Sequence, residues 1–339
     1  MTTHGFNGRL TPASLLRTET GVLFLIVFAG LTGLSVFTEQ FLVTFNIYVL
    51  LYNIALATLV AYGQMVVVAT GGFNISLGAT GALSVVISAM LMEWYDVPLP
   101  VVIAAGLGSG VVMGWINGYL TVKTGIHSFI ITLGTASAYT GATMAITNAN
   151  PFYDIYGGVI KWGQARWGFW PWPATVTVIV VVLLALLFHR MVLGRQILAV
   201  GGNEQAAQLT GVPVKRVVVW AHMLSGLLAA IAGFLTMARV EAGAPTIGND
   251  WLLPSFAAII IGGVVLEGGR IAILGTLLGV TLLGVIGNAL AINHVNPFWV
   301  TLLQGSLILV AVIVGTAVRS TKPAPLFRSQ AATPGEGIE

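Results

Sequence analysis

The chain has 339 residues, of which 57% are hydrophobic and only 7% are charged, and its mean hydropathy is +0.94. These values exclude a soluble globular protein and indicate an integral membrane protein. The absence of cysteine excludes disulfides, thiolate nucleophiles and cysteine-ligated metals, and the net charge of +3 gives no reason to expect a nucleic-acid partner.

Apolar runs of about 20 residues, the length that a transmembrane helix requires, recur along the whole chain. The first run follows a polar segment at residues 1–19 and shows no cleavage site of small residues, so we expect an uncleaved span and not a signal peptide. Residues 319–339 are rich in Pro, Ala and Gly and are expected to form a disordered tail. The expected fold is all-α, with one transmembrane domain at 20–318 and about ten spans: 20–37, 44–69, 76–93, 98–122, 127–147, 171–189, 217–238, 252–266, 271–290 and 297–318.

Charge supports an even number of spans, although 252–266 and 271–290 lie so close together that they could form one broken helix. If the N-terminus is cytoplasmic, ten spans leave only Lys161, Arg166 and Arg239 outside, which agrees with the positive-inside rule. We therefore expect both termini and the loop 190–216 in the cytoplasm. Eleven of the 14 basic residues then lie inside: Arg9, Arg17, Lys123, Arg190, Arg195, Lys215, Arg216, Arg270, Arg319, Lys322 and Arg328.

The segment Thr70–Gly78, with the sequence TGGFNISLG, interrupts the apolar pattern. Gly71 and Gly72 break the end of a long run, and Asn74 or Ser76 could cap the helix that restarts. Because a broken helix persists at membrane depth only where protein or water meets its backbone, Asn74 and Ser76 are candidates for lining a path. An ordinary cytoplasmic turn is the alternative.

Glycines at a spacing of four mark two later spans. Gly106, Gly110, Gly114 and Gly118 follow one stripe of the fourth span, and Gly275 and Gly279 follow one of the ninth. Such stripes let two helix backbones approach closely. The fourth and ninth spans would be equivalent in an inverted five-helix repeat, although the glycine pairs 71–72 and 262–263 do not share that offset. Other polar residues within spans are expected to make interhelical hydrogen bonds: Gln64, Asn117, Thr132, Thr135 and Asn288.

The external segment 148–172 contains Trp162, Trp167, Trp170 and Trp172. Aromatic residues commonly anchor a protein at the membrane interface. The alternative is that this segment receives a soluble partner, and the spacing does not separate the two.

The cytoplasmic segment Gly194–Arg216 is the one long polar interruption between spans. We expect a short helix, exposed to a partner, that Gly201, Gly202 and Asn203 open and that Gly211 and Pro213 end. Asn203 is the expected N-cap, and the charge of Glu204 complements the helix dipole. Residues of this helix expected to contact the partner are Gly201, Gly202, Asn203, Glu204, Gln205, Ala206, Ala207 and Gly211.

Away from the span ends no Asp, Glu, Lys or Arg lies within a predicted span, whereas carriers driven by ions or protons commonly keep one. No paired carboxylates, metal-spaced histidines or nucleophile turn indicates an enzyme, and no metal or cofactor is expected. The histidines His189, His222 and His294 are scattered and are expected at helix ends or in the core. The sequence has no GxxxxGK[ST] loop, so ATP hydrolysis would require a separate subunit.

Three segments now carry a family resemblance. TGGFNISLGATGALS, AVGGNEQAAQLTGV and IIIGGVVLEGGR resemble, in this order, the signatures of ABC importer permeases for ribose and other monosaccharides, within the branched-chain amino acid and sugar permease superfamily. The resemblance extends from about Thr20 to Arg319. The chain departs from the family pattern at Asn74, where an Asp is usual, and near Pro254 and Ser255, where the Asp common upstream of the third signature is absent.

The resemblance implies a ten-helix fold of the vitamin-B12-permease type, as in type II ABC importers, in a bacterial inner membrane. It implies two permease subunits around a central path, ATPase subunits on the cytoplasmic helices and a periplasmic substrate-binding protein outside. The expected function is passage of a monosaccharide or polyol. The alternatives are a stand-alone secondary carrier or channel, or an ABC permease for nucleosides or branched-chain amino acids.

Overall fold

The computed structural model of the chain describes residues 19–296, 298–299, 302, 305–306 and 309. The apolar runs form helices because a backbone in a membrane must satisfy its own hydrogen bonds. Glycine and asparagine end several of them in the left-handed conformation, as Gly125 does at φ 69° and Asn148 at φ 48°. The elements are α2 (Glu19–Phe37), α3 (Thr44–Val68), α4 (Leu77–Glu93), α5 (Leu99–Thr124), α6 (Ser128–Thr147), α7 (Gly157–Gln164), β1 (Arg166–Trp167), β2 (Trp170–Pro171), α8 (Trp172–Arg190), α9 (Val192–Gly202), α10 (Glu204–Leu209), α11 (Val214–Val240), α12 (Leu252–Ile261) and α13 (Ile273–Ile292).

Within the described residues, seven helices are long and apolar enough to cross a membrane, which makes the chain a multi-pass membrane protein. They are α2, α3, α5, α6, α8, α11 and α13, and each coincides with a predicted span. The predicted spans 76–93 and 252–266 correspond to the shorter apolar helices α4 and α12. The span predicted at 297–318 and both terminal segments, 1–19 and 319–339, fall almost wholly outside the described residues.

The prediction for residues 252–266 was wrong at its end. α12 stops at Ile261, because Gly262 is followed by Gly263 in the left-handed conformation at φ 85°. The eleven residues between α12 and α13 are not helical. The pair 252–266 and 271–290 is thus two helices joined by an irregular segment.

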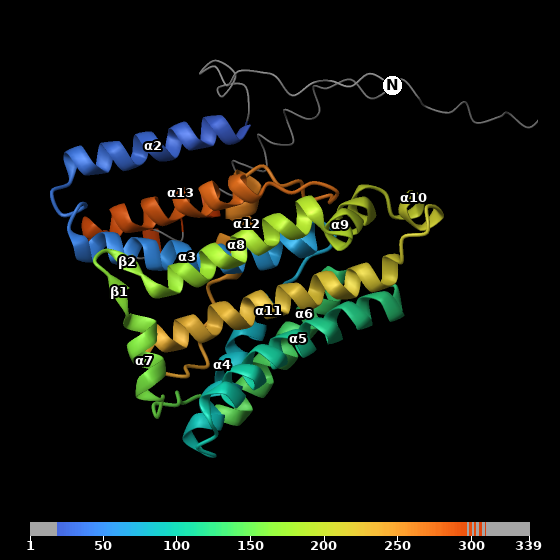
Figure 1. The fold of residues 1–339 in the computed structure, drawn as a ribbon, viewed down its shortest axis with the longest axis horizontal. Helices are drawn as coiled ribbons and strands as arrows, with labels where there is room; N and C mark the ends of the chain where they lie inside the picture. Colours follow the sequence, from blue (N-terminus) through green and yellow to red (C-terminus); the bar gives the residue numbers. More distant parts are fainter. Residues whose placement is uncertain (1–18, 297, 300–301, 303–304, 307–308, 310–339) are drawn as a thin grey trace, which may run out of the picture.

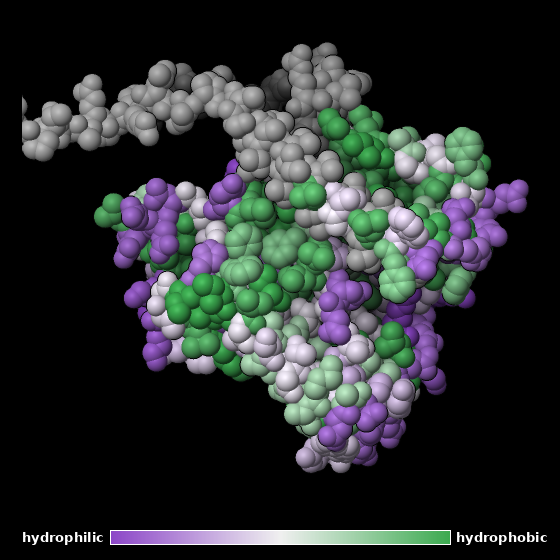
Figure 2. Space-filling model, turned by 180° about the vertical axis from the view of Figure 1, so that it is seen from behind, coloured by the Kyte–Doolittle hydropathy of each residue, from purple (hydrophilic) through white to green (hydrophobic). Residues whose placement is uncertain are grey.

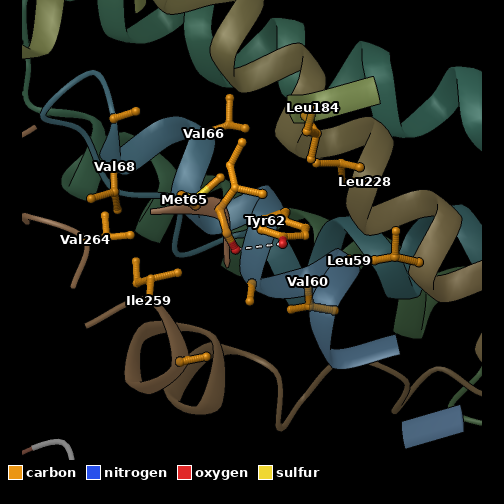
Figure 3. Close-up of a cluster of buried hydrophobic side chains, with 14 of the residues drawn as sticks. Leu59, Val60, Tyr62, Met65, Val66, Val68, Leu184, Leu228, Ile259 and Val264 are labelled. Carbon is orange, nitrogen blue, oxygen red and sulfur yellow. Dashed lines mark hydrogen bonds between the residues drawn. The ribbon is translucent and has the colours of Figure 1, made fainter. Parts of the chain in front are cut away.

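Helix α3 is the buried centre of the fold. From Leu59 to Ala69 nearly every side chain is inaccessible, and α8, α11, α12 and α13 surround it. Figure 3 shows this core, in which the Tyr62 hydroxyl donates a hydrogen bond of 2.9 Å to the backbone carbonyl of Ile273. The Tyr52 hydroxyl likewise donates to the carbonyl of Leu235 at 3.0 Å. Both phenols therefore place a satisfied polar group in an apolar interior.

The predicted glycine stripes lie at helix contacts. A Cβ added at Gly110, Gly114 or Gly118 of α5 would overlap the backbone of α11, and one at Gly106 would overlap Ser88 of α4. In the same way, Gly275 and Gly279 of α13 lie against the α12 side, at Gly262 and Ala258. The pairs α5–α11 and α12–α13 therefore pack backbone to backbone, which no larger residue at these positions would permit.

Two long helices are each followed by a non-helical segment and a shorter apolar helix: α3 by 69–76 and α4, and α11 by 241–251 and α12. The two parts meet, since a Cβ on Gly78 would overlap the carbonyl of Gly248. α3 and α11 are the second and seventh predicted spans, so this pair has the offset of the inverted five-helix repeat. The repeat itself remains a prediction.

Most of the long helices lie roughly parallel or antiparallel, α7 stands across their direction, and α7 and α10 lie at opposite ends of the bundle (Figure 1). Viewed from behind, hydrophobic residues cover the middle of the molecule and hydrophilic residues lie mainly toward its edges (Figure 2). This distribution is the one that a bilayer imposes on a spanning protein.

Candidate functional site

The break after α3 is held by polar side chains from neighbouring helices. The backbone N–H of Phe73 donates to Ser128 Oγ at 2.8 Å, and that of Ile75 donates to Thr132 Oγ1 at 3.0 Å. The side-chain amide of Gln64 faces both backbone groups of Asn74, at 2.9 Å from its carbonyl and 3.3 Å from its nitrogen. The backbone groups freed by the break thus find side-chain partners on α3 and α6.

A chain of side-chain hydrogen bonds connects this break to the helices α11, α5 and α6. Asn74 Nδ2 donates to Ser225 Oγ on α11 at 2.9 Å, and Ser76 Oγ donates to Asn74 Oδ1 at 2.9 Å. Asn117 of α5 donates to Ser76 Oγ at 2.7 Å and accepts a bond of 2.7 Å from Thr135 of α6. Asn117 is therefore the residue that joins α5 and α6 to the break.

The prediction that the side chain of Asn74 or Ser76 caps α4 was wrong. Ser76 occupies the N-cap position, but neither it nor Asn74 caps the helix, because their side chains bond to each other. Asn74 and Ser76 are also almost completely buried, at 1% and 0% exposure. In this conformation of the single chain neither side chain reaches an open path.

The three signature segments meet at a cluster of backbone groups, mostly of glycines, which we call the glycine junction. Its residues are Ala69, which directly precedes the first segment, Gly71 after α3, Gly201 and Gly202 at the end of α9, and Gly268 and Gly269 before α13. The N–H of Gly269 donates to the carbonyl of Ala69 at 3.0 Å. A Cβ on Gly201 would overlap both groups, and one on Gly268 would approach Gly71 N to 2.6 Å. Sequence reasoning treated the segments separately, since their meeting depends on contacts across about 200 residues.

The expected cytoplasmic helix is two helices. Gly201 and Gly202 end α9 instead of opening the helix, because the chain turns to the extended conformation at Asn203. α10 then begins, and Asn203 Oδ1 accepts a bond of 2.9 Å from the N–H of Ala206, as expected of an N-cap. Glu204 lies in the first turn of α10, and Gly211 adopts φ 83° after its end.

The exposed surface of α10 differs from the one expected. Ala207 is buried at 4% exposure and packs into the core, so it is not available to a partner in this structure. The exposed residues include Glu204, Gln205 and Ala206. Leu209, which sequence reasoning missed, is 89% exposed.

The segment 148–172, expected to be external, is folded onto the bundle. α7 is followed by a two-stranded hairpin in which Trp167 pairs with Trp170, and Trp170 Nε1 donates to Thr175 Oγ1 at 3.0 Å. Trp167 is 64% exposed, and the guanidinium of Arg166 lies 5.4 Å from the centroid of the Tyr48 ring.

No group of three or more potential metal ligands occurs among the described residues. A cavity of about 560 Å³ lies under α7, away from the glycine junction, and its lining contains none of the predicted path residues. It is lined by Leu99, Ile103, Leu107, Gly158, Val159, Trp162, Val176, Ile231, Phe234 and Leu235.

Comparison with known proteins gives consistent results. Residues 45–312 match the model of a family described as branched-chain amino acid transport system permease components. The chain is 36% identical over 294 residues to the ribose import permease protein of Bacillus subtilis, covering 86% of this chain and 91% of the relative. It is 33% identical over 292 residues to the D-allose transport system permease protein of Escherichia coli, covering 86% and 90%.

A further relative is the fructose import permease protein of Rhizobium meliloti, which is 32% identical over 310 residues, or 88% of this chain and 84% of the relative. The similarity spans nearly the whole of these chains. It therefore covers the glycine junction, the break after α3 and the helices α9 and α10 together.

Proposed function

The chain belongs to the sugar permease family of ABC importers, and from this premise we propose that it forms the translocation path of an ATP-driven importer for a monosaccharide or a related polyol. The observation that carries the proposal is the glycine junction. It joins the exposed cytoplasmic helices to the one break in the helix at the centre of the fold.

The ATP-driven step requires a partner, which we place on α10. α10 is exposed, is capped by Asn203 and presents Leu209. The ATPase contact is assigned to α10 and its flanks, with Gly201 and Gly202 linking it to the bundle. Movement of α9 and α10 by an ATPase would act on Ala69 and Gly71 through backbone contacts that contain no flexible side chain.

We place the path beside the segment Gly71–Ser76. Its backbone is already held by side chains, so a coordinated shift of α3, α5, α6 and α11 is needed before Asn74 or Ser76 faces a passing sugar. Uncharged polar groups suit such a path, because a sugar carries hydroxyls but no net charge. Gly71 and Gly72 permit the turn, since Gly71 adopts φ 83° and a Cβ on Gly72 would lie 2.7 Å from Ser128 Oγ.

The remaining partners follow from the same proposal. A second permease subunit, identical or different, completes the path, and a periplasmic substrate-binding protein docks on the external face that carries α7 and the hairpin. The protein lies in the bacterial inner membrane with residues 1–19, the loop 190–216 and residues 319–339 in the cytoplasm. It has no catalytic site of its own and binds no cofactor.

The test is to purify the tagged chain from its source cells, to measure ATP hydrolysis in the eluate and to reconstitute the eluate into vesicles. We expect an ATPase to co-elute and labelled pentoses or hexoses to enter only with ATP. Sugar entry without ATP would instead establish a stand-alone carrier or channel. Orientation is tested separately in this cysteine-free chain: a cysteine replacing Gly157 should react from the periplasm, and one replacing Gln205 should not.

A further inference from the structure

A groove of about 490 Å³ runs between α5 and α11, and the proposed function does not use it. Its walls combine aromatic, aliphatic and basic side chains. The lining residues are Trp115, Tyr119, Val122, Lys215, Arg216, Val219, Trp220 and Met223.

The glycine stripe explains why this groove exists. Gly114 and Gly118 bring α5 into backbone contact with α11 at His222 and Val219. The residue after each glycine on α5 is large, and the rings of Trp115 and Tyr119 stack with centroids 5.2 Å apart. The two helices touch at the glycines, and the large side chains beside this contact form the walls of a groove that is open to the surroundings. Trp115, Tyr119 and Trp220 are 46%, 40% and 52% exposed.

All the charge of the groove is positive and lies at one end. α5 ends at Thr124 and α11 begins at Val214, so Lys123 falls in the last turn of one helix and Lys215 and Arg216 in the first turn of the other. The Lys123 ammonium lies 5.4 Å from the Tyr119 ring centroid. No acidic residue lines the groove.

From this basic end the groove continues along the membrane-spanning part of both helices. Trp115 and Met223 each lie eight residues from Lys123 and Lys215, which corresponds to about 12 Å along the helix axis. Between these levels the walls are Val122, Val219 and the aromatic rings. A charged mouth that leads into an apolar channel matches a molecule with an anionic head and a hydrocarbon tail.

We propose that this groove binds an anionic phospholipid of the cytoplasmic leaflet. Its phosphate lies between Lys215, Arg216 and Lys123, and the first part of one acyl chain lies along Val219 and Met223. Basic pockets between helices at the cytoplasmic surface are suited to such head groups, and aromatic side chains favour the same interface. An acidic protein surface would match the charges but not the apolar continuation. The inference depends on the orientation given under the proposed function.

The test uses the purified permease in detergent with phosphatidylglycerol or phosphatidylcholine, and native mass spectrometry measures the bound lipid. The variant is Lys215→Gln with Arg216→Gln. Each basic residue near a membrane surface strengthens attraction to anionic lipid by roughly fivefold, so the variant is expected to bind phosphatidylglycerol about 25-fold more weakly. Phosphatidylcholine binding should change little.

A matched control removes the same charge from the same side: Arg190→Gln with Arg195→Gln, on α8 and α9 and outside the groove. We expect it to bind phosphatidylglycerol as the unmodified chain does, and size-exclusion chromatography verifies that both variants are folded. Equal weakening by both variants, or none by the Lys215 and Arg216 variant, would overturn the proposal. So would a variant that binds lipid normally but loses an ATPase partner, since the groove would then be a protein contact. Lipid binding is measured on the permease alone. Its result can therefore be interpreted even if the test of ATP-driven uptake fails.

Discussion

The backbone N–H of Gly269 donates a hydrogen bond of 3.0 Å to the carbonyl oxygen of Ala69, and Gly201 lies against both groups. The bond joins the end of the central helix α3 to the segment that precedes α13. Because Gly201 lies in the last turn of α9, this helix is in contact with the bond, and α10 follows directly after Asn203. The consequences can be tested one residue at a time.

Two adjacent glycines offer a matched pair at the glycine junction. A Cβ on Gly201 would overlap the Ala69 carbonyl and lie 2.5 Å from the Gly269 nitrogen, whereas one on Gly202 would find its nearest neighbour, the Gly269 Cα, at 4.0 Å. We expect Gly201→Ala to destabilise the fold by about 1–3 kcal/mol, the usual cost of overpacking, and to reduce ATP-dependent uptake. Gly202→Ala should leave both near normal. Thermal unfolding and vesicle uptake measure the two effects, and equal behaviour of the variants would contradict the junction.

The exposed leucine of α10 is expected to anchor the ATPase. Leu209→Ala should weaken co-elution of the ATPase by about tenfold, the loss of an interface residue that contributes more than 1 kcal/mol. The neighbouring exposed residue Gln208 provides the control, and Gln208→Ala should bind normally. Unchanged binding by Leu209→Ala would remove α10 from the interface. Ala207→Trp, by contrast, should destabilise α10 itself, because Ala207 is buried.

Sequence patterns predicted the helices of this protein well, because the length of an apolar run and the glycines that end a helix act locally. The stripe from Gly106 to Gly118 and the cap at Asn203 both follow from neighbouring residues. The burial of Ala207 and the bond from Asn74 to Ser225 could not be predicted, because they depend on which helices meet. The end of α12 was missed for another reason: the apolar residues Val264 and Val265 continue the pattern after the glycines that stop the helix.

Asn117 is expected to contribute most to the stability of the polar network. Asn117→Leu removes the partner of Ser76 and of Thr135. Interhelical hydrogen bonds in membranes average about 0.6 kcal/mol and reach about 1.7 kcal/mol, so we expect a loss of about 1–3 kcal/mol. The control is Thr58→Val, at a buried threonine that donates only within its own helix, to the Ile54 carbonyl. Unfolding in mixed detergents compares the two, and a larger loss for the control would contradict the network.

For His222 we predict a substitution that does not destabilise the fold, in contrast to the one at Asn117. Its side chain is fully buried, and neither ring nitrogen has a hydrogen-bond partner among the described residues. Replacing an unsatisfied buried polar group by an apolar one of similar size is neutral or stabilising. We expect His222→Met to raise the free energy of unfolding by about 0–2 kcal/mol and to leave uptake intact. A stable variant that no longer transports would show that the imidazole acts in transport.

The candidate path residue Asn74 can be tested by accessibility. Its side chain is buried and bonded to Ser225, so a cysteine at position 74 should be protected from a small thiol reagent in the permease alone. If the break after α3 opens onto the path, the same cysteine should react when the assembled transporter turns over ATP and sugar. A cysteine at the exposed Gly157 should react in both conditions and controls for reagent access. Protection of position 74 throughout turnover would assign Asn74 to packing, and the path would then have to follow other faces of α5 and α6.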